Sequence, residues 1–166
     1  MFKDDPKSFV ARLSLVQGDR ERYVKASSGN VWGDENGWLT LDDCAPPQVF
    51  CFDFLDKKEE RLYYSISGAS ATPYAGKYLD VSRNGYLGFY AGAESARWGL
   101  ELLRETEQQE LYFKLIDPTG RAVNEETGMT YSKFLVFPME RGVKTLLNSM
   151  AGDRIATLCT KDIHFI

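Results

Sequence analysis

Three pairs of an aromatic residue followed by leucine lie at a constant spacing of 48 positions in this chain of 166 residues. The three pairs are Trp38-Leu39, Tyr86-Leu87 and Phe134-Leu135. Around the second pair, the stretch GKYLDVSRNGYLGFY (76–90) places Asn84-Gly85 between two short apolar runs. Asn-Gly in that setting is typical of a tight β-hairpin, because both residues accept the left-handed backbone of the turn. We therefore predict a hairpin that occurs in several copies.

Strand-like segments on either side of this hairpin recur in the same order. Their apolar residues alternate with others, which is the period-2 pattern of a strand with one buried face. The matching sets are Leu13/Leu15, Tyr64/Ile66 and Phe113/Leu115 before the hairpin, and Phe50/Phe52/Phe54 and Trp98/Leu100/Leu102 after it. Polar stretches at Asp56–Glu60 and Glu105–Glu110 separate the copies, and we expect solvated turns there. The prediction is one domain, 1–166, with units at about 9–56, 59–105 and 110–166.

Three units of four short strands predict an all-β fold. A threefold repeat of about fifty residues resembles the β-trefoil, and GKYLDVSRNGYLGFY is most similar to the glycine–aromatic–leucine hairpin of fascin-like trefoils. The resemblance implies a closed barrel whose strands turn their apolar faces inward. The repeat predicts a core of Leu13, Leu15, Val24, Leu39, Phe52, Tyr64, Ile66, Leu79, Leu87, Leu100, Phe113, Leu115 and Leu135.

The third unit departs from this pattern. The polar stretch RAVNEETGMTYSK (121–133) takes the place of a tidy second strand. Further on, apolar residues follow the helical spacing i, i+3, i+4 and i+7 at Val143, Leu146, Leu147 and Met150. Gly152 stands where a glycine commonly ends a helix. We therefore expect a short helix over Arg141–Ala151, inserted before the last strands.

Composition excludes several classes of protein. The formal net charge is −4, whereas nucleic-acid-binding surfaces carry clustered lysine and arginine. No apolar run is long enough to span a membrane, and the first residues lack the apolar region of a secretory signal. We expect a soluble, cytoplasmic protein, with leaderless export left open. Three cysteines without a CxxC pair, Cys44, Cys51 and Cys159, favour reduced, buried thiols.

No pattern in the sequence predicts catalysis, a cofactor or a metal site. The single histidine, His164, alternates with Ile163 and Phe165 as a strand residue does. Neighbouring carboxylates such as Glu125-Glu126 are expected in turns, where burial would not raise a carboxyl pKa. Phosphate-binding glycine loops and nucleophile motifs are absent from the sequence. We therefore expect a protein that is not an enzyme.

Aromatic residues beside aspartate and asparagine are the strongest candidates for ligand binding. An aromatic ring stacks on the apolar face of a sugar, while carboxylate and amide groups bind its hydroxyls. Trp98, Tyr74 and Tyr90 are also expected at the surface. The candidate ligand-binding residues are Trp32, Asp34 and Asn36 in the first unit and Asn84, Tyr86 and Tyr90 in the second.

Two functions remain open at this point. The first is lectin-like carbohydrate binding through the loops between strands, without the Gln-x-Trp triplet of ricin-type lectins, which this sequence lacks. The second is a protein-interaction trefoil: a protease inhibitor, a fascin-like binder or a protein that neutralises a toxin. The partner is accordingly a glycan or another protein, and the oligomeric state is not predicted.

Overall fold

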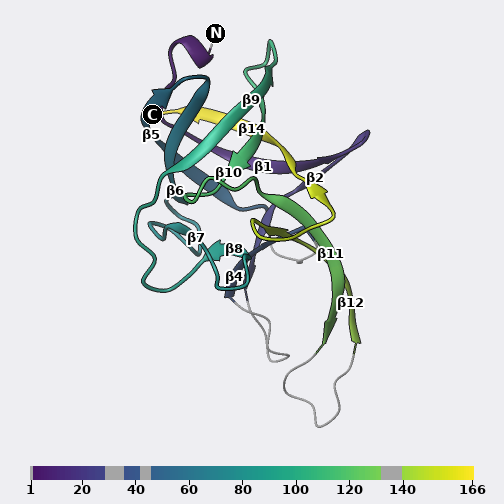
Figure 1. The fold of residues 1–166 in the computed structure, drawn as a ribbon. Helices are drawn as coiled ribbons and strands as arrows, with labels where there is room; N and C mark the ends of the chain where they lie inside the picture. The colour runs from purple at the N-terminus through teal and green to yellow at the C-terminus, as the bar shows by residue number, and fades with distance from the viewer. Residues whose placement is uncertain (1, 29–35, 42–45, 132–139) are drawn as a thin grey trace.

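The computed structural model describes residues 2–28, 36–41, 46–131 and 140–166 (Figure 1). Of residues 28, 36, 128–131 and 140–144 it describes the backbone alone. The fold is all-β, as the sequence predicts, and it consists of two sheets. A short 3-10 helix, η1 (Phe2–Asp4), precedes the first strand.

Six antiparallel strands of the first sheet form a closed ring. Each pairs with the next, and the last returns to the first, so the ring is a barrel. In ring order they are β1 (Phe9–Gln17), β5 (Val49–Lys58), β6 (Arg61–Gly68), β9 (Trp98–Glu105), β10 (Leu111–Ile116) and β14 (Thr157–Phe165). A further strand, β2 (Arg20–Tyr23), pairs with β1.

Three hairpins make up the second sheet. They are β3 (Lys25–Ser28) with β4 (Asn36–Thr40), β7 (Leu79–Val81) with β8 (Leu87–Phe89), and β11 (Asn124–Tyr131) with β12 (Glu140–Asn148); β13 (Arg154–Ile155) pairs with β11. The hairpins also contact one another in a ring. Its three pairs are Trp38 with Gly88, Tyr86 with Asn148 and Leu146 with Thr40.

Equivalent pairs of buried residues face each other across neighbouring strands at three places around the barrel. Phe52 lies opposite Ile66, Leu100 opposite Leu115, and Leu158 opposite Leu15. All six side chains are buried, because the period-2 alternation turns them to the same side of their strands. Each pair joins the last barrel strand of one repeat to the first barrel strand of the next. The repeated sequence pattern therefore corresponds to repeated strand pairing.

The core predicted from the repeat is confirmed for every residue that the structure describes. Val24, Leu79 and Leu87 are buried at the hairpins, and the other predicted residues are buried in the barrel or in β4. Leu135 lies outside the described residues. Phenylalanine rings fill much of the barrel, with Phe9 stacked on Phe52 at a centroid distance of 4.6 Å. Burying a Leu, Ile or Phe side chain contributes about 1.5–3 kcal/mol, so this core is the main source of stability.

The helix predicted at Arg141–Ala151 is wrong, because this part of the chain forms β12. Its residues pair antiparallel with β11 from Asn124↔Asn148 to Tyr131↔Glu140. The helical spacing of Val143, Leu146 and Leu147 is also compatible with a strand, in which Thr145 and Leu147 are buried on alternate positions. Main-chain hydrogen bonds to β11 decide between a helix and a strand here. These bonds require residues of β11, such as Glu126 opposite Leu146, that are distant in the sequence.

Among the described residues, Leu146-Leu147 is the structural counterpart of the first two aromatic–leucine pairs. Leu146 lies opposite Thr40 as Trp38 lies opposite Gly88 and Tyr86 opposite Asn148. Leu146-Leu147 therefore takes the place of Trp38-Leu39, and Leu147 is buried like Leu39 and Leu87. Phe134-Leu135, which the constant spacing selects, lies outside the described residues. The third hairpin is longer than the others, and its extra residues shift the repeat along the chain.

The two ends of the molecule differ in what they present. Both chain termini lie at one end, and the β4 and β8 strands lie at the other (Figure 1). The β11–β12 ribbon extends away from the barrel (Figure 1). In the described part of the chain, no helix is long and apolar enough to cross a membrane.

Candidate functional site

The turn between β7 and β8 presents Asn84 at its tip. The turn closes with two backbone hydrogen bonds, from Ser82 to the carbonyl oxygen of Tyr86 and from Gly85 to that of Ser82, both 2.9 Å. The Tyr86 amide also donates to the Ser82 Oγ over 3.1 Å. Gly85 has a φ of +92°, a backbone conformation that glycine adopts without strain. Asn84 is exposed, so its side-chain amide faces solvent beside the aromatic residues that follow.

Tyr86 stacks on Trp38 of β4. Their ring centroids are 5.1 Å apart and the ring planes are inclined by 21°. Both side chains are half-buried, so each keeps an accessible part after stacking. The Tyr90 hydroxyl donates to the carbonyl oxygen of Tyr86 over 2.7 Å and places a third half-buried aromatic ring on the same hairpin.

Glu126 and Asn148 bring polar groups to this stack. Burial raises the pKa of the Tyr86 hydroxyl, and the charge of Glu126 and a hydrogen bond to that carboxylate raise it further. The Asn148 Nδ2 donates to the Glu126 Oε2 over 3.1 Å and to the backbone oxygen of Asn84 over 3.1 Å. The Asn148 side chain is only 2% exposed and is therefore held in place by its surroundings. Its hydrogen bond orients the Glu126 carboxylate. We call Trp38, Tyr86, Tyr90, Glu126 and Asn148 the hairpin cluster.

The structure brings together one of the two predicted groups of site residues. Asn84, Tyr86 and Tyr90 lie within one hairpin and its flanks, next to Trp38. In the other group, Trp32 and Asp34 lie outside the described residues. Asn36 begins β4 opposite Ser28, and only its backbone is described.

Two aromatics expected at the surface are buried. Trp98 is fully buried at the start of β9, and Tyr74 packs its ring on Phe89 at 5.3 Å and donates its hydroxyl to the Ser27 carbonyl oxygen. The expectation fails because Trp98 continues the inward alternation of Leu100. Neighbouring charges such as Arg97 do not change the face to which a strand residue points.

The expectation that Glu125-Glu126 lies in a turn is also wrong, because both residues belong to β11. Glu125 is 2% exposed, and its Oε1 pairs with the Arg154 Nε at 2.7 Å. A buried carboxylate needs such a partner, because burial without one is costly. Glu126, on the opposite face, reaches the hairpin cluster instead.

Trp38, Glu126 and Asn148 were missed as site residues by sequence reasoning. The repeat contains a signal for Trp38, since it occupies the same place as Tyr86. Glu126 and Asn148 come from the third hairpin, whose alignment to the repeat is hidden by its extra residues. Nothing in the local sequence indicates that they meet Tyr86.

The cluster combines groups that can contact a polar ligand. Aromatic surface lies next to one oriented carboxylate and the exposed amide of Asn84. Among the described residues, no group of three or more His, Cys, Asp or Glu side chains is arranged to hold a metal ion. Of the cysteines that the structure describes, Cys159 is buried, and burial raises the pKa of its thiol to about 11, whereas Cys51 is half-buried. His164 lies on β14, as expected for a strand residue.

Comparison with known protein families, with curated proteins and with solved structures finds no match to this chain. The function is therefore argued from the site itself.

Proposed function

We propose that the chain is a β-trefoil. Three features support this: the closed six-stranded barrel, the three hairpins that contact one another in a ring, and the cross-strand pair that occurs three times. A fourth is a repeated irregularity of the ladder at Leu55 and Leu103, which are 48 positions apart and are both exposed. An experimental structure with three superposable four-stranded units is the expected result. Units that do not superpose would contradict the proposal.

We propose that the protein is a non-catalytic carbohydrate-binding module that acts through the hairpin cluster. The observation that carries this is the half-buried stack of Trp38 on Tyr86 beside an oriented carboxylate, Glu126. The C–H groups of a pyranose pack on aromatic surface, and its hydroxyls donate to carboxylates and amides. One face of each ring is covered by the other ring, so the sugar contacts the parts that remain accessible, with the Asn84 amide as a further polar group.

A glycan array followed by calorimetric titration of the bound sugar tests this function. Trp38→Ala removes the aromatic surface, and we expect loss of detectable binding. Because this change also removes packing, Asn84→Ala is the second variant; its side chain is exposed, and we expect about fivefold weaker binding with unchanged stability. Tyr23→Ala, an exposed tyrosine on β2, is the matched control and should bind like the wild type. Absence of any glycan signal, or equal affinity of all three folded variants, would contradict the proposal.

A protein-interaction function is the second candidate, and the β11–β12 ribbon favours it. Beyond Glu126, the described residues of β11 pair with β12 alone, and β12 pairs with β4 at Leu146 only. The ribbon thus extends from the barrel with backbone groups at its edges, and such edges pair readily with other chains. Retention of a purified partner by the wild type, but not by a variant with a shortened ribbon, supports this function. Release of that partner by free sugar would instead favour carbohydrate binding.

A further inference from the structure

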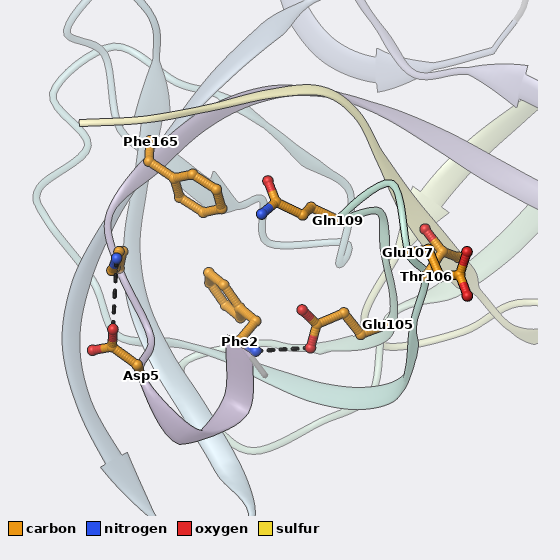
Figure 2. A pocket seen from close by; sticks show the side chains of 8 residues that line it. Phe2, Asp5, Glu105, Thr106, Glu107, Gln109 and Phe165 are labelled. Carbon is orange, nitrogen blue, oxygen red and sulfur yellow. Dashed lines mark hydrogen bonds and ion pairs between the residues drawn. The ribbon is translucent and has the colours of Figure 1, made fainter.

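A recess lies between residues near the two chain termini and the turn after β9 (Figure 2). Its volume is about 420 Å³, within the range of small-molecule sites. It is formed by the N-terminal segment, the end of β14 and the turn after β9, three parts of the chain that are far apart in sequence. The hairpin cluster is at the other end of the fold, so the two sites are separate (Figure 1).

Two phenylalanine rings form the apolar wall of this recess. Phe2 stacks on Phe165 with centroids 6.0 Å apart and planes inclined by 27°. Phe2 also packs edge-on against Phe9 at 5.8 Å, which anchors it to the barrel core. Phe165 is 40% exposed and offers part of its ring to a ligand. Both rings point into the recess, as does the side chain of Gln109 (Figure 2).

The charged groups around these rings are mainly negative. Asp5, Glu105 and Glu107 line the recess with one cation, Lys7, so the formal net charge of the lining is 1 − 3 = −2. Lys7 pairs with Asp5 at 3.5 Å, which leaves the other two carboxylates without a cation among the described residues that line the recess. Glu105 accepts a hydrogen bond from the Phe2 backbone amide through Oε2, over 2.8 Å, and this holds the carboxylate beside the ring. Glu107 is exposed at the rim.

We propose that this recess binds a small amphipathic ammonium ion. The exposed part of the Phe165 ring, backed by the buried Phe2, accepts the apolar body of such a ligand and attracts its positive charge through its π-system. Glu105 and Glu107 supply the opposite charge, and the Gln109 amide offers a hydrogen-bond acceptor for an ammonium proton. A neutral ligand gains only the apolar part of these interactions, and an anion is repelled by the carboxylates.

The test is a titration of the full chain with 2-phenylethylammonium, followed by amide chemical shifts in NMR spectra. We expect saturable shifts at Phe165, Gln109 and Glu107, and binding that weakens as salt is added. The uncharged analogue 2-phenylethanol should bind at least fivefold more weakly, the factor expected for loss of one exposed charge contact. Glu107→Gln should weaken binding of the cation by about the same factor while the stability of the protein is unchanged.

Two controls make the outcome decisive. Glu94→Gln removes an exposed carboxylate that does not line the recess, and it should leave affinity unchanged. Phe165→Leu keeps apolar bulk but removes the ring. We expect it to weaken binding of the cation more than binding of the neutral analogue, each compared with the wild type. Equal affinity for the cation and the neutral analogue, equal affinity of the wild type and Glu107→Gln, or saturable shifts elsewhere than at the recess would each overturn the proposal.

Discussion

The Nδ2 of Asn148 donates a hydrogen bond to the backbone oxygen of Asn84, 64 positions earlier in the chain, over 3.1 Å. The same amide donates to Glu126, and its Oδ1 accepts from the backbone amides of Met150 and Ala151 at 2.7 and 2.9 Å. One buried side chain therefore joins the second hairpin to both strands of the third and to the turn that follows. The hairpin cluster depends on this connection.

Asn148→Ala should destabilise the fold. It removes four hydrogen bonds and leaves two backbone amides and a carboxylate without this partner, at a cost of about 2–3 kcal/mol in the free energy of unfolding. Asn84→Ala is the control, because only the backbone oxygen of Asn84 takes part, and it should change stability by less than about 0.5 kcal/mol. Urea denaturation measures both. Equal stability of the two variants would show that the Asn148 side chain contributes nothing.

Gly85→Ala should lower the stability of the protein more than Gly92→Ala. Both glycines have positive φ, +92° and +78°, so both substitutions carry a backbone cost of about 1 kcal/mol. At Gly85 a Cβ would also collide with the Asn148 Oδ1 and lie 2.7 Å from the Met150 Cβ, whereas at Gly92 it meets open space. We expect a melting temperature at least about 4 °C lower for Gly85→Ala than for Gly92→Ala. Similar melting temperatures would mean that the second and third hairpins do not pack as described.

Glu21 should make stability depend on pH on the acidic side. A hydrogen bond from Lys161, whose Nζ lies 2.6 Å from the Glu21 Oε2, lowers the Glu21 pKa. Burial acts in the opposite direction, and a hydrogen bond from Tyr112 lowers the pKa further. The lowered pKa means that the stabilisation is present above the pKa of the unfolded chain, near 4.3, and is lost as pH falls through the folded value.

Glu21→Gln should therefore lower the free energy of unfolding at pH 7 by about 1 kcal/mol or less, because the pair is partly exposed. The difference from wild type should shrink below about pH 4. Denaturant titrations at pH 7, 5 and 3 measure this, with Asp19→Asn in the exposed turn between β1 and β2 as the control. A difference that is constant with pH would exclude an electrostatic contribution from Glu21.

The outer part of the β11–β12 ribbon should be dispensable for folding. Met129 lies opposite Val143, so replacing residues 130–142 with Asn-Gly joins this pair by a two-residue turn. The strand residues removed pair only within the ribbon, and the buried Leu147 and Asn148 are kept. We expect a change in the free energy of unfolding below about 1 kcal/mol, measured by thermal and urea denaturation. Failure of this variant to fold would show that the ribbon contributes to the core.

Much of the barrel follows from local sequence. Leu13, Ile66 and Leu115 are buried because alternation along a strand sets the face to which each side chain points, and this requires no knowledge of the partner strand. The hairpin at Asn84-Gly85 is equally local, since glycine permits the backbone that the turn requires. The same alternation includes Trp98 with Leu100 and places it inside, and the expectation of an exposed Trp98 conflicted with that pattern.

The third hairpin could not be predicted in the same way. Val143, Leu146 and Leu147 satisfy a helical and a strand spacing at once, and only pairing with β11 selects the strand. The ring of hairpin contacts identifies Leu147 as the counterpart of Leu39 and Leu87 among the described residues. An insertion inside a repeat moves its residues along the chain but leaves their places in the fold unchanged, so constant spacing fails there.

The sequence by itself determined that this protein is built from short strands with one buried face, and it determined which side chains fill most of the core. Tertiary structure alone decided that Trp38 would meet Tyr86, that Glu126 would reach them, and that Phe2 and Phe165 would enclose a recess with Glu105. The reason is physical. Burial of alternate residues is a property of each strand, whereas a binding site arises where strands from distant parts of the chain are brought together, and their register is set only when the barrel closes.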